Sequence, residues 1–523
     1  KVEEGHKIAR AAAVIGTATF ISRVLGFIRD MVVAKGFGAT SAADTFYVAY
    51  RIPNLLREMF AEGSISAAFI PVFTEYLTKR SKEEAVRLAN ASFTIILVIL
   101  SGISILGIVF TPAIVRLIAP GFGSDPEKAY LTILLTRIMF PFLLFVGIAA
   151  QAMGILNSLK SFFSPAMAPA MFNVVIIAST LVISPMLDRP ILGVAIGVLL
   201  GGLVQFLYQV PSMRRNGFAP GLIFDPFHPG VKRIALLILP VMFGLSVSQI
   251  NLLINTILAS YLPEGSVSYL YYGMRLIQFP LGMFGVAIAT AILPTMSAQV
   301  ARGELGEMRE TLSFGMRLVL FITLPAIAGL IFFRVPIIHL LFQHGEFSYK
   351  ATLGTATALL YYSLGLWAFA GVRIAVPAFY SMQDTATPVK VAVISLIVNI
   401  ALNILLIRPL GHGGLALASS VSSSLNLLLL LWILRGKIGR IDGRKIARST
   451  IKALAASVVI VLVGIIISQN GVWELEGSWG YKAILLGSGM GISIAGYIFI
   501  HTLLKTDELV FLFDLIRKRR QHK

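Results

Sequence analysis

The chain has 523 residues, of which 57% are hydrophobic and 13% charged, and its mean hydropathy is +0.84. Because soluble proteins carry about 25% charged residues, this composition excludes an ordinary soluble domain. The net charge of +19 comes without a basic patch interleaved with aromatic residues, so it does not indicate nucleic acid binding, and the absence of cysteine excludes disulfides and thiolate metal sites.

Apolar runs of about 20 residues recur along the chain, and that is the length a helix needs to cross the hydrocarbon core. The alternating ten-residue strands of an outer-membrane barrel are absent, so helices must satisfy the backbone in lipid. We therefore predict an all-α integral membrane protein with 14 transmembrane helices. The predicted spans are 11–34, 41–77, 88–116, 128–157, 163–185, 190–210, 233–262, 267–299, 312–341, 351–380, 388–408, 413–435, 448–469 and 481–504.

The loops favour one orientation. If the N-terminus is inside, the cytoplasmic connections and both tails hold about 28 Lys and Arg, against about 6 on the opposite side. This bias predicts that both termini are cytoplasmic. It also accounts for the net positive charge, because basic residues at that surface meet anionic membrane lipids.

The chain repeats weakly at an offset of about 223 residues. AAFIP at 67–71 resembles TAILP at 290–294, and TPAIVRLIAPGF at 111–122 resembles VPIIHLLFQHGEF at 335–347. Each repeat holds six spans, an even number, which predicts two six-helix lobes in parallel pseudo-repeat with two extra C-terminal helices. The predicted domains are an N-lobe at 1–210, a cytoplasmic linker at 211–232, a C-lobe at 233–436, the two extra spans at 437–505 and a basic cytoplasmic tail at 506–523. The tail fits either an amphipathic helix on the membrane or a solvated segment.

Charged residues lie where the first two spans are predicted. They are Arg23, Arg29, Asp30, Asp44, Arg51, Arg57, Glu58, Glu62 and Glu75. A charge at bilayer depth costs about 2.5–3.5 kcal/mol, so such residues persist where they line a hydrated cavity, pair with each other or bind a charged ligand. Arginine binds phosphate in a bidentate way, and the pattern therefore predicts a transporter of an anionic cargo.

Two local alternatives stay open. Arg29 and Asp30 could instead cap a helix near the interface. Arg275, deep in the eighth span, could complete a phosphate clamp or form a buried pair with Glu62 or Asp44. The chain shows no nucleophile–base arrangement, ATP-binding loop or histidine spacing for a metal, so we do not predict an enzyme. The glycine triplets 193, 197, 201 and 487, 489, 491 predict close helix packing.

Three segments carry a resemblance to a known family. They are SRVLGFIRD at 22–30, DTFYVAYRIPNLLREMFAEGSISAAFIPVF at 44–73 and YYGMRLIQFPLGMFGVAIATAILP at 271–294. They resemble the MurJ (MviN) lipid II flippases, which are similar in fold to the MATE-like exporters. The resemblance implies that the chain moves lipid II, the undecaprenyl-diphosphate-linked peptidoglycan precursor, from the inner to the outer leaflet of the bacterial cytoplasmic membrane by alternating access. Peptidoglycan biosynthesis, cell-wall biogenesis and cell shape would then depend on it.

The resemblance also implies roles for individual residues. Those implied to bind the substrate are Arg23, Arg29, Asp30, Asn54, Arg57 and Arg275; those implied in gating are Asp44, Glu62 and Arg373. Glu62 is expected to pair across the lobes, with Arg373 as the candidate partner. The two extra spans correspond to the family's groove for the long lipid tail.

Some family members bind sodium through carboxylates. The matching positions here are the neutral residues Asn255, Asn399, Asn403 and Ser419. Fewer charged ligands mean weaker binding of a hard cation, so we expect no tight sodium site and no other cofactor. Interhelical hydrogen bonding is the favoured role for these amides.

Two other classes of function remain. A MATE-like exporter of another anionic lipid-linked saccharide or small molecule would use the same fold. A non-transporting scaffold for cell-wall assembly would not need buried arginines, which disfavours it. The expected partners are lipid II, membrane lipids and the cell-wall synthesis machinery, and we expect a monomer.

Overall fold

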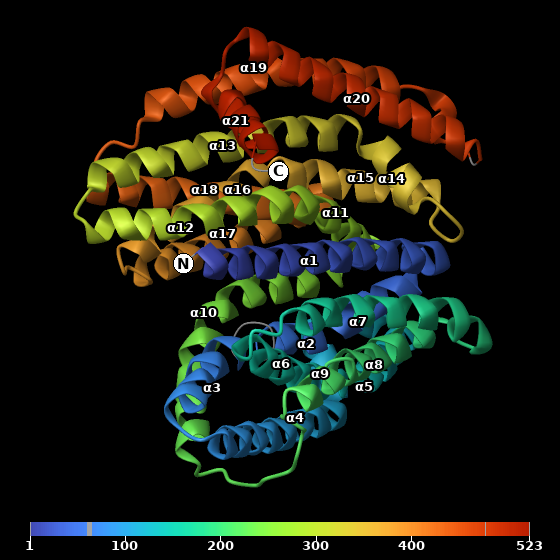
Figure 1. The fold of residues 1–523 in the computed structure, drawn as a ribbon. Helices are drawn as coiled ribbons and strands as arrows, with labels where there is room; N and C mark the ends of the chain where they lie inside the picture. Colours follow the sequence, from blue (N-terminus) through green and yellow to red (C-terminus); the bar gives the residue numbers. More distant parts are fainter. Residues whose placement is uncertain (1, 60–64, 476, 522–523) are drawn as a thin grey trace. The chain divides into compact units, whose positions relative to one another are not determined.

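The computed structural model describes the backbone of residues 2–59, 65–475 and 477–521, and every regular element among them is a helix (Figure 1). Side chains are described over the same ranges except at residues 2–13, 66–67, 239–248 and 515–521. The chain divides into two compact units, Lys1–Val267 and Ser268–Lys523. The predicted all-α class is confirmed.

The first unit is a bundle whose helices pack on neighbours far apart in sequence. Its helices are α1 (Val2–Phe37), α2 (Ser41–Arg57), α3 (Ser66–Lys79), α4 (Lys82–Ile118), η2 (Pro120–Ser124), α5 (Pro126–Met139), α6 (Phe142–Ser158), α7 (Phe163–Val182), η3 (Ser184–Met186), α8 (Ile191–Leu207), α9 (Val210–Arg215) and α10 (Pro229–Ala259). Helix α7 packs on both α1 and α8, and α2 packs on α5. A Cβ at Gly197 of α8 would lie 2.8 Å from Ser179 Cβ of α7, so the close packing predicted there is confirmed.

Helix α10 belongs to the first unit by its contacts. It packs against α3 and α4, and Arg233 Nη1 of α10 lies 2.7 Å from Glu75 Oε2 of α3. The repeat would place this helix at the start of the second lobe. The first unit therefore includes one more long helix than the predicted N-lobe, while the repeat-based lobe boundaries stay a prediction.

The segment between α9 and α10 is extended and attached to α4. Gly221 N donates to Asn90 Oδ1 at 2.9 Å, and Ile223 N donates to Thr94 Oγ1 at 2.9 Å. Arg87 of α4 forms an ion pair of 3.1 Å with Asp225. These contacts satisfy backbone groups that no helix satisfies, so the linker follows the surface of α4.

The second unit is a second helical bundle. Its helices are α11 (Ser266–Pro280), whose first turn crosses the unit boundary, the π-helical turn η4 (Leu281–Gly285), α12 (Val286–Ala301), α13 (Leu305–Phe332), α14 (Arg334–Phe342), α15 (Tyr349–Ser363), α16 (Leu366–Ser381), α17 (Ala386–Leu410), α18 (His412–Ile438), α19 (Gly443–Ser468), η5 (Gly471–Trp473), α20 (Trp479–Leu503) and α21 (Asp507–Gln521).

Asp384 lies in the loop before α17 and accepts hydrogen bonds from Lys437 and from Thr387. These two bonds, that of Lys437 first, hold the pKa of the Asp384 carboxyl well below its ordinary value.

The two extra C-terminal helices pack on the second unit. Helix α19 packs along α13, and α20 packs on α19 and α14. Trp473 and Phe333, each 1% exposed, belong to the core between them. Lys482 of α20 is also buried, and its Nζ lies 3.0 Å from His339 Nε2 of α14. The close helix packing predicted at glycines 487, 489 and 491 is wrong for two of them. An added Cβ at Gly487 or Gly491 of α20 would have no neighbour within 4 Å.

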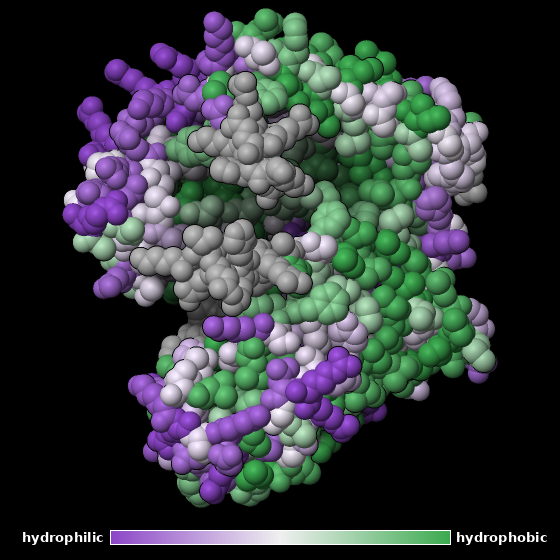
Figure 2. Space-filling model, in the orientation of Figure 1, coloured by the Kyte–Doolittle hydropathy of each residue, from purple (hydrophilic) through white to green (hydrophobic). Residues whose placement is uncertain are grey.

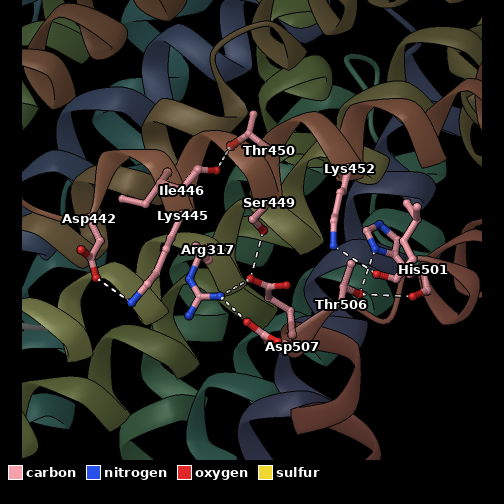
Figure 3. Close-up of polar contacts among 12 residues, drawn as sticks. Arg317, Asp442, Lys445, Ile446, Ser449, Thr450, Lys452, His501, Thr506 and Asp507 are labelled. Carbon is pink, nitrogen blue, oxygen red and sulfur yellow. Dashed lines mark hydrogen bonds and ion pairs between the residues drawn. The ribbon is translucent and has the colours of Figure 1, made fainter.

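The C-terminal tail begins as a helix attached to this bundle. Glu508 Oε1 of α21 accepts from Arg317 Nη1 of α13 at 2.8 Å and from Ser449 Oγ of α19 at 3.0 Å. Figure 3 shows Arg317, Ser449 and Asp507 converging from three helices. Glu508 is 2% exposed and Leu509 lies in the core, so a merely solvated tail is wrong for the start of α21.

Ten described helices or helix pairs are long and apolar enough to cross a membrane, and the bent pair α15–α16 raises the number to eleven. The other predicted spans fall on α1, on α2 with α3, and on α10, so the described structure does not confirm the number fourteen. Large apolar side chains are exposed on many helices, such as Val109 at 60% and Ile466 at 71%. Figure 2 shows wide hydrophobic areas on the surface, as a lipid-facing protein requires.

Candidate functional site

Arg29 and Asp30 lie inside a helix and not at its end. Helix α1 continues to Phe37, about two turns further, so the helix-capping alternative is wrong. Arg29 Nη2 donates to Asp30 Oδ1 at 2.7 Å, and Arg29 Nη1 donates to Asn173 Oδ1 of α7 at 3.2 Å. The Arg29 side chain is 14% exposed and the Asp30 side chain 2%. This pair therefore sits at the α1–α7 interface, with Asp30 buried and a small part of Arg29 exposed.

Asn173 completes this cluster. Its Nδ2 donates to Ser22 O at 3.2 Å and to Pro169 O at 3.1 Å, while its oxygen accepts from Arg29. The side chain thus joins two helices and fixes the direction of the guanidinium. Arg23, six residues before Arg29, is exposed and faces about 120° away around α1. The two arginines therefore do not share one face of the helix.

A second cluster lies at the end of α2. Arg57 Nε donates to Asn54 Oδ1 at 3.1 Å, and Asn54 Nδ2 donates to Glu58 Oε1 at 3.0 Å. Glu58 Oε2 also accepts from Gln249 Nε2 of α10 at 2.5 Å. One turn-and-a-half of helix therefore presents a cation, an amide and a carboxylate together, since residues three and four apart lie on one face.

Asp44 makes a third cluster, at the first turn of α2. It is 1% exposed; its Oδ2 accepts from Gly265 N at 2.8 Å and lies 3.5 Å from Lys128 Nζ of α5. The Lys128 ammonium also lies over the Phe122 ring at 4.2 Å. A carboxylate at a helix N-terminus with an ammonium and an N–H donor is well stabilised. Asp44 therefore fastens the loop after α10 to α2 and α5.

The same loop is fastened at two further points. Gly121 N of η2 donates to Ser260 Oγ at 3.1 Å, and Ser41 N donates to a Glu264 carboxylate oxygen. A Cβ at Gly121 would lie 2.3 Å from Ser260 O, so only glycine fits this contact. We call the contacts of Ser41, Asp44 and Gly121 with the loop 260–265, together with the Lys128–Asp44 ion pair, the α10-end latch.

Two of the residues implied by the resemblance lie in the second unit and a third lies outside the described residues. In the second unit, Arg275 on α11 is half-buried and Arg373 on α16 is exposed. Arg373 Cδ lies 3.6 Å from the position of a Cβ at Gly285, which places it beside the π-helical turn η4. Glu62 lies outside the described residues, so its pairing with Arg373 stays a prediction.

The neutral residues at the positions of the family's sodium ligands have partners within the protein. Asn403 Nδ2 donates to Asn399 Oδ1 at 2.9 Å, and Asn399 Nδ2 donates to Ser422 Oγ of α18 at 3.2 Å. Ser419 donates to Leu415 O, and Asn255 donates to Asn251 Oδ1 in the first unit. Asn399 therefore joins α17 to α18, which is the interhelical role favoured from the sequence.

Sequence reasoning missed several partners. Asn173 is a lone amide in the apolar run 163–182, and the argument applied to buried arginines would also have found it. Lys128 is one of about six basic residues on the predicted non-cytoplasmic side, and nothing in its sequence neighbourhood signals Asp44. Gly265 contributes only its backbone N–H, so no side-chain pattern could indicate it.

A family model described as lipid II flippase MurJ matches residues 33–485 of this chain. The chain belongs to the MurJ lipid II flippase family. A probable lipid II flippase MurJ of Vibrio cholerae is 37% identical over 519 residues, which are 96% of this chain and 97% of that relative. The lipid II flippase MurJ of Burkholderia cenocepacia is 37% identical over 430 residues, covering 82% and 83% of the two chains.

Solved structures agree with this assignment to the MurJ family. One described as lipid II flippase MurJ in an inward closed conformation matches with a TM-score of 0.77 at 28% identity, covering 94% of this chain and all of that one. An inward-facing multidrug transporter of the MATE family matches with a TM-score of 0.69 at 15% identity, covering 83% and 99%, and this likeness shows the fold alone. The resemblance and the MATE-like fold predicted from the sequence are confirmed, and the family is one of transporters rather than enzymes.

Proposed function

We propose that this chain moves lipid II from the inner to the outer leaflet of the bacterial cytoplasmic membrane by alternating access. The observation that supports this most directly is the Arg29–Asp30–Asn173 cluster. In it, the guanidinium of Arg29, whose side chain is 14% exposed, is held between two long helices of a membrane protein. Placing a charge inside a membrane protein costs free energy, so a charged residue retained there is expected to have a function. Membership of the MurJ family makes the diphosphate of lipid II the anion that this guanidinium suits.

The proposed binding residues are those that the resemblance implies. Arg29 and Arg57 are each already oriented by an asparagine, so their guanidinium forks are directed before any ligand arrives. Pre-oriented donors lose less entropy on binding than flexible ones. Arg23, Asp30 and Arg275 complete the proposed set, with Glu62 and Arg373 as gating residues.

The α10-end latch supports the proposal of alternating access. Alternating access needs contacts that hold one side shut in one state and break in the other. Asp44, Lys128 and the loop 260–265 form such a set, since a buried ion pair and a backbone hydrogen bond meet at one carboxylate. We infer that the latch closes the outer side, on the orientation with both termini in the cytoplasm that the loop charges favour.

The remaining features fit a lipid-linked substrate. Helices α19 and α20 lie outside the repeat and expose apolar side chains such as Ile466 and Ile484, each 71% exposed. We propose that they guide the polyprenyl tail, which can stay in lipid while the headgroup crosses. A monomer without a tightly bound sodium ion suffices for this cycle. An exporter of a different anionic lipid-linked saccharide is the remaining alternative.

Complementation tests the function. The chain should restore growth to bacteria depleted of their own lipid II flippase, and labelled lipid II should appear on the outer face of the membrane. Reconstituted vesicles containing lipid II or another lipid-linked saccharide then separate the two substrates. Translocation of the other saccharide alone, with lipid II left in place, would contradict the proposal.

A further inference from the structure

One carboxylate contacts two of the residues proposed to bind the diphosphate. Glu58 Oε1 accepts from Asn54 Nδ2 at 3.0 Å and lies 3.7 Å from Arg57 Nη2. The Arg57 and Glu58 side chains are 20% and 34% exposed, so solvent and a ligand reach them. An acidic side chain thus lies where an anionic ligand would otherwise be expected to lie.

The second oxygen of Glu58 reaches another helix. It accepts from Gln249 Nε2 of α10, 191 residues later in the chain. Seven residues before Glu58 and seven after Gln249, Arg51 Nε donates to Thr256 Oγ1 at 3.1 Å. Helices α2 and α10 therefore run antiparallel, and these two bonds join them at positions about two turns apart. One of these two joints is made by the carboxylate that also contacts Arg57.

We propose that Glu58 is an internal counter-anion that occupies the Arg57–Asn54 site in the unloaded protein and is displaced by the diphosphate of the substrate. The inference rests on the proposed function, because it takes the diphosphate to bind at Arg57. A carboxylate and a phosphate accept from the same guanidinium and amide donors, so the two anions compete for them. Glu58 is one partner of Arg57 among others, and only this contact is exchanged.

Displacement has a consequence for α10. When Glu58 turns away from Arg57 and Asn54, its bond to Gln249 is lost as well, because both bonds belong to one carboxylate. Substrate binding therefore weakens one of the two joints between α2 and α10. By linkage, a change that weakens this joint also favours substrate binding. Glu58 thus couples occupation of the site to release of α10.

Binding measurements on the full chain in lipid nanodiscs test the proposal. The variant Glu58→Gln keeps a side chain of the same shape but removes the competing charge, so lipid II should bind about tenfold more tightly. Gln249→Leu frees Glu58 from α10 and should tighten binding by a smaller factor. In a vesicle assay, Glu58→Gln should lower both the KM and the turnover number, since the substrate is released more slowly without its competitor.

Glu75→Gln is the matched control. Glu75 joins α3 to α10 through an ion pair of 2.7 Å with Arg233. Because Glu75 is not part of the Arg57 cluster, its replacement should leave the affinity for lipid II unchanged. Glu58→Ala replaces Glu58→Gln if the latter is unstable in thermal unfolding. Unchanged or weaker binding by the Glu58 variants, or equal tightening by the Glu75 variant, would overturn the proposal. A wild-type chain that neither binds nor moves lipid II would instead refute the proposed function.

Discussion

Asp44→Asn should open the α10-end latch while leaving the fold intact. The carboxylate is 1% exposed, accepts from Gly265 N–H at 2.8 Å and forms an ion pair of 3.5 Å with Lys128. Asparagine keeps an oxygen for the Gly265 N–H but loses the charge, and it leaves the Lys128 ammonium, 11% exposed, without this anion. A hydrogen bond to a charged group is worth about 1.5–3 kcal/mol.

A loss of that size lowers the equilibrium constant for latch closure by about 10- to 150-fold. The shift can be measured because the chain has no cysteine, so an introduced pair is the only one present. Ser41 and Glu264 are in contact in the latch. In the Ser41→Cys, Glu264→Cys parent, disulfide formation reports how often the latch is closed. Adding Asp44→Asn should slow this reaction, by at most the factor through which the equilibrium constant falls.

Lys128→Met provides the internal check. Because Lys128 and Asp44 form one ion pair, each single variant should slow disulfide formation, and the double variant should be no slower than the slower single variant. Additive effects would mean that the two side chains act separately. An Asp44→Asn variant that forms the disulfide as fast as the parent would refute the role given to this carboxylate.

Three further outcomes are expected. Replacing Arg23, Arg29 or Arg275 with Ala should abolish complementation at normal protein levels. Lys at these positions should restore activity only in part, because it lacks the bidentate guanidinium fork. Full activity of all three Ala variants would contradict their role. Transport in sealed vesicles should fall when the membrane potential is collapsed, because that potential supplies about 2.3 kcal/mol per charge per 100 mV. Transport should barely respond to a sodium gradient. Strict sodium dependence at constant potential would contradict this expectation. Glu508→Ala removes the buried partner of Arg317 and leaves only the exposed Asp507, so it should cost about 1–3 kcal/mol of local stability. Helix α21 should then become sensitive to protease, while Asp442→Ala, which affects an exposed pair, should leave it resistant.

Much of the architecture was predictable because its causes are local. The length of an apolar run and the cost of a buried charge depend on neighbouring residues alone, so the helical membrane class and the unusual status of Arg29 followed from the sequence. The capping alternative for Arg29 failed because α1 continues through it. The spacing of six residues also places Arg23 and Arg29 about 120° apart around the helix.

The partners of these charges were decided by tertiary packing. Arg29 meets Asn173 at a separation of 144 residues, and Asp44 meets Gly265 at a separation of 221, because α1 packs on α7 and the loop after α10 packs on α2. No local pattern encodes such a pairing. Likewise, the repeat assigns α10 to the second lobe, whereas the contacts of Arg233, Gln249 and Ser260 attach it to the first unit.

The sequence by itself thus determined what the buried groups are and roughly how deep they lie, since both depend on composition along one helix. Only the tertiary structure decided that the carboxylate of Glu58 reaches both Arg57 and α10, and that Asp44 closes a latch with a backbone N–H. The physical reason is that a side chain's partner is whichever group the packed helices bring within about 3 Å, and that distance depends on the relative placement of elements far apart in the chain.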